Sequence, residues 1–326
     1  MKFLHFILFF ASLLIAAALS HATHPAEVYW RNVLPNTPMP KIIQDLLRSG
    51  SSGKPGGRTE VNVDKQEIPV NTSHARYTRP TPIPGYTRPS GSFRNYHRGS
   101  EDQKLLDNPN SALIFLEKDL HSGTKMNLQF FKTTKGAIFM PRQVVKSKPF
   151  SSNKLTDILS QFSVDPKSKQ AEVIKETIKE CEAPSESKEQ KYCATSLESM
   201  IDFSTSKLGK NVNALATEMN KEVAEKQEYV VQSGVKQMKG DNSIVCHGQP
   251  YLYAVYYCHA THATRAYVVP LVGNNGTKIK AVALCHTDTA SWNPKHMAFQ
   301  VLKVKPGTVP VCHFLPEDHI LWATKN

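Results

Sequence analysis

The sequence predicts an α+β domain with a helical middle section, a mostly antiparallel C-terminal β-sheet or barrel, and disulfide bonds that staple it. Apolar residues recur at three- and four-residue intervals up to Glu228, which favours helices. Beyond Ile244 the chain changes to dense β-branched and aromatic runs separated by Gly, Asn and Pro, which favours strands. Four Cys-His dipeptides lie at or near the ends of these runs, separated by 10, 25 and 25 residues.

The chain divides into four segments. Residues 1–20 are typical of a secretory signal peptide, and no other apolar run is as long, so we expect no membrane span in the mature protein. Residues 21–48 are amphipathic and are expected to dock on the main domain. Residues 49–110 are rich in Gly, Ser, Pro and Arg and predict a disordered linker, because they bury too little apolar surface to offset the entropy of ordering. Residues 111–326 form the folded domain.

Helices are expected where apolar residues recur every three or four positions. This pattern follows Pro40, spans Lys169 to Cys181, and returns from Val212 to Glu228. Strands are expected where β-branched and aromatic residues cluster between turn-forming residues. Those runs are Tyr251–Tyr257, Arg265–Val272, Lys278–Leu284, Ala298–Val304 and Val309–Phe314.

The cysteines are predicted to form disulfides, because a signal peptide implies an oxidising route in which thiols pair. Ligation of zinc by Cys and His together is the alternative. Cys181 and Cys193 lie close in sequence and predict a local bond, whereas the other four cysteines allow three connectivities. The six are Cys181, Cys193, Cys246, Cys258, Cys285 and Cys312.

Adjacent residues of a strand point to opposite faces, so a Cys-His dipeptide can send sulfur to one side and imidazole to the other. We therefore predict one metal ion held by the four histidines of the dipeptides, with unconnected surface or core histidines as the alternative. Cu(II) suits a tetragonal array of imidazoles, and zinc suits a tetrahedral one. His262 and His296 are close enough in sequence to support the ligands, whereas His121 and His319 lack a comparable context. The predicted ligands are His247, His259, His286 and His313.

This array, CH-X10-CH-X25-CH-X25-CH, resembles the BURP domain of plant secreted proteins. The resemblance covers residues 25–48 and 111–324 and implies the same fold for this chain. Flanking segments agree with it: Val28–Trp30 and Leu34–Pro40, Ala112–His121 and Gly123–Met126, and Cys246–Tyr251 with Val255–His259.

Some members of that family are copper-dependent peptide cyclases, which cross-link a Trp or Tyr side chain of a core peptide in the same or a related chain. The resemblance therefore implies that copper bound by the histidines oxidises the chain's own linker in an autocatalytic cyclisation. The linker contains no Trp. Its candidate substrate residues are Tyr77, Tyr86 and Tyr96, two of which begin the repeated sequence Tyr-Thr-Arg-Pro.

The alternative is a non-catalytic protein of the apoplast or cell wall. It is similar to the BURP-type non-catalytic β subunit of polygalacturonase and to dehydration-responsive and seed members. A net charge of +12 and a pI near 9.3 favour acidic partners. Outside a plant cell these are pectic polysaccharides, and nucleic acid lies in the wrong compartment. Delivery to the vacuole by the secretory pathway is a further possibility.

Two short motifs predict N-glycosylation, at Asn71 and at Asn275. Asn275 is the stronger candidate, because Gly273-Asn274-Asn275-Gly276 predicts an exposed hairpin turn. Sequence motifs of other enzyme classes are missing: there is no G-x-S-x-G elbow, no H-E-x-x-H helix, no P-loop and no dinucleotide fingerprint.

Overall fold

The computed structural model describes residues 24–48, 113–134, 136–184, 190–223, 225–238, 242–261 and 263–325. The predicted signal peptide and linker, with Asn71, Tyr77, Tyr86 and Tyr96, lie outside the described residues, as does His262. The α-helices are α2 (Pro25–Val33), α3 (Lys41–Arg48), α6 (Arg142–Lys146), α7 (Leu155–Gln161), α8 (Lys169–Glu182), α9 (Leu197–Leu208) and α10 (Met297–Leu302).

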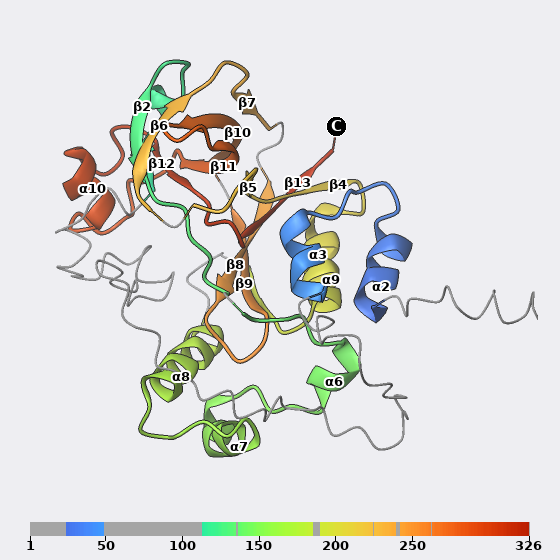
Figure 1. Ribbon diagram of the computed structural model, residues 1–326. Helices are drawn as coiled ribbons and strands as arrows, with labels where there is room; N and C mark the ends of the chain where they lie inside the picture. Colours follow the sequence, from blue (N-terminus) through green and yellow to red (C-terminus); the bar gives the residue numbers. More distant parts are fainter. Residues whose placement is uncertain are drawn as a thin grey trace, which may run out of the picture.

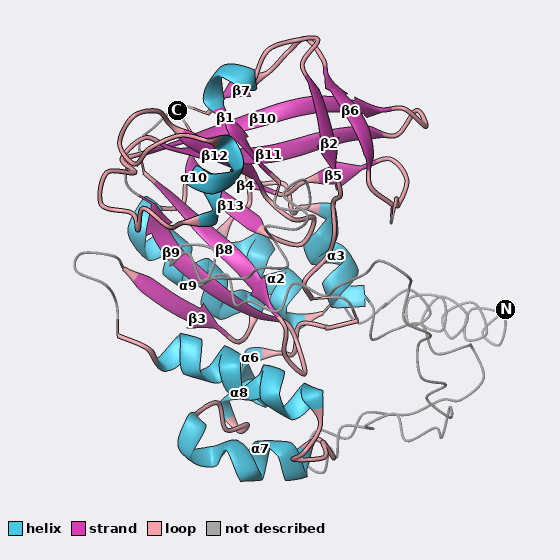
Figure 2. Ribbon diagram, turned by 90° about the vertical axis from the view of Figure 1, so that its left-hand side faces the viewer, coloured by secondary structure: helices cyan, strands magenta, loops and turns pink. Residues whose placement is uncertain are grey.

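The described strands form two antiparallel sheets (Figures 1 and 2). The large sheet has the order β1-β12-β11-β10-β6-β2, with β5 beside β11 and β7 beside β10. The small sheet has the order β3-β9-β8-β13-β4. The large-sheet strands are β1 (Ile114–Leu116), β2 (Lys125–Leu128), β5 (Glu218–Met219), β6 (Gln227–Val231), β7 (Lys236–Gln237), β10 (Thr264–Gly273), β11 (Lys278–His286) and β12 (Val311–Phe314); the small-sheet strands are β3 (Lys191–Ala194), β4 (Val212–Leu215), β8 (Ser243–Gln249), β9 (Val255–Thr261) and β13 (Ile320–Thr324).

Residues 24–48, the N-terminal segment, pack on the small sheet through α2 and α3, which lie beside α9 (Figure 1). Trp30 lies with its ring centroid 5.4 Å from that of Trp322 on β13, and its indole N–H donates to the Thr37 carbonyl at 2.9 Å. The Thr37 hydroxyl donates to the carbonyl of Val212 on β4 at 2.6 Å. These contacts join the beginning of the described chain to its last strand.

Helices α7 and α8 lie at the far end of the small sheet from the large sheet (Figure 2). Their buried faces meet in a core of their own, in which Ile158, Ile174 and Ile178 are fully enclosed. The α8 helix begins where the Ser168 hydroxyl accepts from the Ala171 N–H, which satisfies one of the unpaired donors of its first turn. None of the helices in the described ranges is long and apolar enough to cross a lipid bilayer.

The predicted α+β class is confirmed, and so are the helix over Lys169–Cys181 and the hairpin turn at Asn275, whose backbone is exposed between β10 and β11. Two expected elements are wrong. The predicted helix from Val212 to Glu228 is instead β4, β5 and the start of β6, because alternate residues from Val212 are buried against β13. The predicted strand Ala298–Val304 contains most of α10, which His296 begins by accepting from the Ala298 N–H.

Candidate metal centre

The Cys-His dipeptides of the small sheet lie on neighbouring strands, β8 and β9. Cys246 is directly opposite Cys258 in the register, and their sulfurs form a disulfide of 2.07 Å. The register places His247 and His259 diagonally across the pair, on the face opposite the sulfurs. Diagonal neighbours are about 7–8 Å apart at Cα, within reach of long side chains. Nε2 of His247 accordingly lies 3.1 Å from Nε2 of His259. We call these two residues the small-sheet pair.

The large sheet repeats this arrangement on β11 and β12. Cys285 is opposite Cys312, and the two form a disulfide of 2.05 Å. His286 and His313 meet on the other face, with their Nε2 atoms 3.4 Å apart and their ring centroids 5.5 Å apart. We call them the large-sheet pair. The third disulfide joins Cys181 to Cys193, so all six cysteines are paired as predicted and none is free.

Each disulfide of a Cys-His module belongs to the core of its own sheet. Cys246 and Cys258 lie in the small-sheet core, and Cys285 and Cys312 lie in the large-sheet core. The histidines occupy the other faces, and one member of each pair is within electrostatic range of the other pair, because His259 contributes to the lowered pKa of His313. Sulfur and imidazole thus lie on opposite faces of each sheet, as strand geometry predicts.

The geometry of each pair fits two ligands of one ion. Two imidazole nitrogens bound at about 2.0–2.1 Å, at an angle between a right angle and a tetrahedral angle, lie ~2.8–3.4 Å apart. The observed separations of 3.1 and 3.4 Å fall in this range. In the part of the chain that the structure describes, however, no group of three or more His, Cys, Asp or Glu side chains stands in metal-holding geometry. The four histidines of the dipeptides are thus present as two pairs.

His319 adds a third imidazole to the small-sheet pair, although it lies outside the Cys-His array in the sequence. It directly precedes β13, and its Nδ1 lies 3.0 Å from Nδ1 of His247. Beside it, the buried carboxylate of Asp318 accepts from the Thr133 hydroxyl at 3.1 Å and from the Thr134 hydroxyl at 2.6 Å. The signal available in the sequence was a charged dipeptide, Asp318-His319, immediately before an apolar strand.

The large-sheet pair has a different neighbour, the indole of Trp292. This ring lies 5.1 Å from the His286 ring and 4.8 Å from the His296 ring, measured between centroids. His296 is fully buried, and its Nδ1 accepts from the Ala298 N–H at 3.1 Å. The structure therefore places His296 next to the site as expected, while assigning one of its ring nitrogens to the start of α10.

Burial keeps two of the site's histidines, His313 and His319, neutral. Burial lowers the pKa of His313 to about 4, and the charges of His319, His259 and His296 act in the same direction. Burial likewise lowers the pKa of His319 to about 4, against the opposing effect of Asp318. A neutral imidazole can bind a metal ion, whereas a protonated one cannot. These two side chains stay in the ligand-competent form well below neutral pH.

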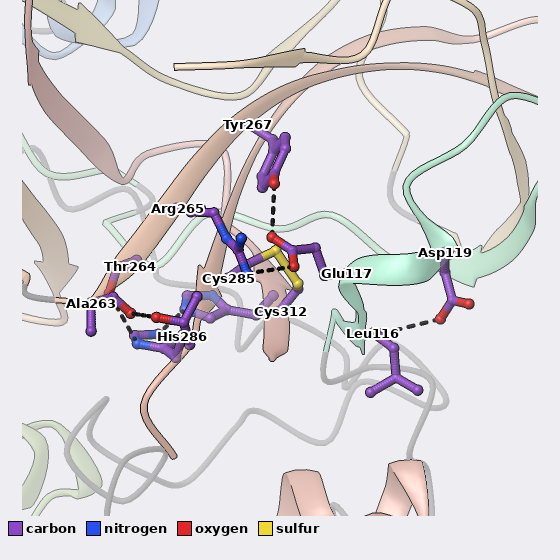
Figure 3. Close-up of a disulfide and its surroundings, with 12 residues drawn as sticks. Leu116, Glu117, Asp119, Ala263, Thr264, Arg265, Tyr267, Cys285, His286 and Cys312 are labelled. Atoms are coloured by element: carbon purple, nitrogen blue, oxygen red, sulfur yellow. Dashed lines mark hydrogen bonds and ion pairs between the residues drawn. A yellow bond between two sulfur atoms is a disulfide. The ribbon is translucent and has the colours of Figure 1, made fainter. Parts of the chain in front are cut away.

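A bridge of polar side chains lies beside the large-sheet disulfide (Figure 3). The carboxylate of Glu117, just after β1, accepts from Arg265 at 2.8 Å and from the Tyr267 hydroxyl at 2.7 Å. Both partners come from β10, so Glu117 reaches across β12 and β11. Burial and the bond to Glu117 raise the pKa of Tyr267 to about 12. The bridge fastens β1 to the rest of the sheet on the cysteine side.

The sequence that carries these two Cys-His modules matches a known family. The model of the BURP domain matches residues 113–324 of this chain. The chain belongs to the BURP domain family. Similar relatives include BURP domain-containing protein 3 of Oryza sativa subsp. japonica, 53% identical over 70% of this chain and 54% of its own length. BURP domain protein RD22 of Arabidopsis thaliana is 50% identical over 77% of this chain and 65% of its own length.

A more distant relative covers nearly the whole chain. Protein RAFTIN 1B of Triticum aestivum is 32% identical over 94% of this chain and 92% of its own length. By contrast, the chain spans 54% and 65% of the first two relatives. Membership of this plant family is thereby established for the chain, and its activity is a separate question.

Proposed function

We propose that this BURP domain protein binds copper through its two histidine pairs and acts as an autocatalytic peptide cyclase on residues 49–110. In this reaction a tyrosine side chain, Tyr77, Tyr86 or Tyr96, becomes covalently joined to a nearby residue of the same segment. Two hydrogen atoms are removed, and dioxygen, reduced to hydrogen peroxide, is the oxidant. Bound copper would supply one-electron oxidation, which zinc does not provide.

The observation that carries this proposal is the place where the candidate substrate segment joins the domain. Strand β1 begins at Ile114 and pairs with β12, where Ile114 is the register partner of His313. Leu113 precedes it, and its carbonyl accepts from the Phe314 N–H at 2.9 Å. The segment before residue 113 is thus tied to the strand that carries a predicted ligand. Tethering in one chain gives an effective concentration on the order of millimolar.

The residues around the pairs have distinct roles in this proposal. His247, His259, His286 and His313 would hold the metal. His319 and Asp318 would orient His247, because an imidazole nitrogen that faces a fixed partner leaves the other nitrogen directed at the ion. Burial of His247, His259 and His313 excludes water from that side of the site, whereas His286 is partly accessible. The accessible side of the large-sheet pair is where a tyrosine would approach.

The test combines mass spectrometry with copper binding. Purified protein is incubated with Cu(II) and dioxygen and then digested. A peptide containing Tyr77, Tyr86 or Tyr96 should be about 2 Da lighter than calculated, because two hydrogens are lost. His259→Ala should abolish the loss and weaken Cu(II) binding. The matched control is His121→Ala, since His121 is exposed and lies outside the array. An unmodified segment after full copper loading contradicts the cyclase proposal.

One observation favours a second candidate, a non-catalytic role in the apoplast or cell wall. The net charge of +12 attracts acidic polymers such as pectin. Under this candidate the segment stays unmodified and the protein binds demethylated pectin saturably, with an affinity that falls as salt is added. Both candidates assume secretion, as proposed from residues 1–20, with the vacuole as the alternative destination; the mature N-terminus and glycosylation at Asn71 or Asn275 can be read from the same mass spectra.

A further inference from the structure

We infer that the N-terminal segment is held by the domain as a separate binding partner, and that it stays in place when the chain between residues 49 and 112 is cut. The protein would then persist as a two-chain assembly without a covalent link between the chains. This inference concerns the binding surface on the small sheet, and it does not depend on the proposed cyclase activity.

The segment is buried as a core element. Its apolar side chains face α9 and the small sheet within one continuous core, which also contains Trp322. At the centre, Trp30 is 2% exposed and packs on the fully buried Trp322. The enclosed residues of the segment are Ala26, Trp30, Leu34, Ile43, Leu46 and Leu47. Removing the segment would expose these side chains together with their partners on α9 and β13, which is strongly unfavourable.

Polar contacts fix the segment at several points along its length. The Thr37 hydroxyl donates to the Val212 carbonyl, and the ammonium of Lys325 donates to the carbonyl of Asn36 at 2.5 Å. In the middle of α2, the Tyr29 hydroxyl donates to Asp202 of α9. These bonds have defined partners on elements far away in the sequence, so they specify one seated position.

The elements on either side of residues 49–112, α3 and β1, are each hydrogen-bonded to the domain. At one end, the carbonyl of Leu46 in α3 accepts from the Phe139 N–H at 3.0 Å. At the other end, β1 pairs with β12. No cysteine lies in residues 24–48, and the three disulfides join residues between 181 and 312. Packing and hydrogen bonds alone would therefore hold the segment after a cut, and release of any intervening peptide requires two cuts.

The test introduces one recognition site for a specific protease between residues 53 and 54 and another between residues 107 and 108 of the full chain. After complete digestion, size-exclusion chromatography under native conditions separates the products, and mass spectrometry identifies them. The piece that contains residues 24–48 should elute with the domain, while the excised middle piece elutes alone. Separate elution of the N-terminal piece overturns the inference. Elution at twice the expected mass also overturns it, since the segment would then be exchanged between two copies.

Two variants test whether the seated contacts are responsible. Trp30→Ala should weaken retention of the cut segment by about a hundredfold or more, because it empties the contact with Trp322. Val28→Ala is the matched control on the same helix, since Val28 is 43% exposed, and it should retain the segment like the parent. If Trp30→Ala fails to fold, Thr37→Val serves instead and should weaken retention about tenfold by leaving the Val212 carbonyl unpaired. If the folded variant retains the cut segment as well as the parent does, these contacts do not hold the segment on the domain.

Discussion

The small sheet and the large sheet carry the same Cys-His module in different surroundings. In both, a disulfide joins directly opposed residues and the histidines meet diagonally on the other face. The small-sheet pair is buried and is extended by His319. The large-sheet pair is partly accessible at His286 and adjoins Trp292. Identical local geometry thus follows from strand register, whereas the environment follows from what packs on each sheet.

This difference suggests a division of work between the pairs. Under the proposed function the buried pair would hold an ion firmly, because its neighbour His319 also contacts Thr133 and the ring positions are fixed by these contacts. A partly open pair beside an aromatic ring is suited to receive another side chain. Variants that alter one sheet and leave the other intact test whether the two pairs differ in this way.

The largest effect is expected from removing the buried disulfides. Closing a loop of 27 residues, as Cys285–Cys312 does, stabilises by about 3.5 kcal/mol, and a loop of 12 residues, as in Cys246–Cys258, by about 3 kcal/mol. Replacing either buried pair by Ala also leaves a void that costs about 1 kcal/mol more. Urea denaturation of the two double variants measures both losses in the free energy of unfolding.

The third disulfide supplies a matched control for that experiment. Cys181–Cys193 also has a separation of 12 residues, but both cysteines are partly exposed. Replacing this pair should cost the loop-closure contribution of about 3 kcal/mol without the void. Equal losses for the two pairs of separation 12 would show that core packing around Cys246 adds nothing.

Acid should destabilise the metal-free protein through one histidine in each region. His313 and His319 have pKa values near 4 in the folded state, compared with 6.5 for an ordinary histidine. Between pH 6.5 and 4 the unfolded chain therefore binds more protons, and the free energy of unfolding falls as the pH falls. Each group contributes about 1.4 kcal/mol per pH unit, so over this pH range each destabilises the protein by on the order of 3 kcal/mol.

Replacing one of these two histidines distinguishes the contribution of each sheet to the pH dependence of stability. His319→Asn should roughly halve that pH slope, from about 2.7 to about 1.4 kcal/mol per unit. Urea denaturation at a series of pH values gives the slope directly. A full slope in His319→Asn would mean that this residue is not the buried neutral group of the small-sheet site.

The smallest effect distinguishes two glycines, one in each sheet. A Cβ on Gly248 would come within 2.6 Å of Thr134 Cγ2 and 2.7 Å of Thr133 Oγ1, the residues that hold Asp318. Gly248→Ala should therefore cost about 1–3 kcal/mol in unfolding free energy by overpacking. Gly273→Ala on β10 meets the end of the Gln227 side chain, which can turn away if it gives up its bonds to the Tyr229 hydroxyl and the Asn275 N–H, so its cost should be about 1 kcal/mol, at the lower end of that range.

Features of the fold and the site could be predicted from the sequence where they depend on residues close together in the chain. Alternation along a strand is local, so the opposite faces of Cys and His followed from sequence, whereas convergence of the four histidines on one ion stays a prediction. The disulfide connectivity did not follow from sequence, because it depends on which strands become neighbours. The segment from Val212 has helical spacing, yet pairing with β13 makes it a strand. His319 was missed for a similar reason: it gains its role from the pairing of β13 with β8, which brings it beside His247.

The disulfide pattern and the Trp30 contact have a consequence for folding during synthesis. Each cysteine pairs with the next one along the chain, over separations of 12, 12 and 27 residues. Every bond can therefore form soon after its second cysteine is synthesised, with little opportunity for mispairing. Trp30 of the N-terminal segment is made long before its partner Trp322 on β13. Docking of α2 must therefore wait until β13 has been synthesised, and a chain that stopped before β13 would leave an exposed tryptophan to which chaperones can bind.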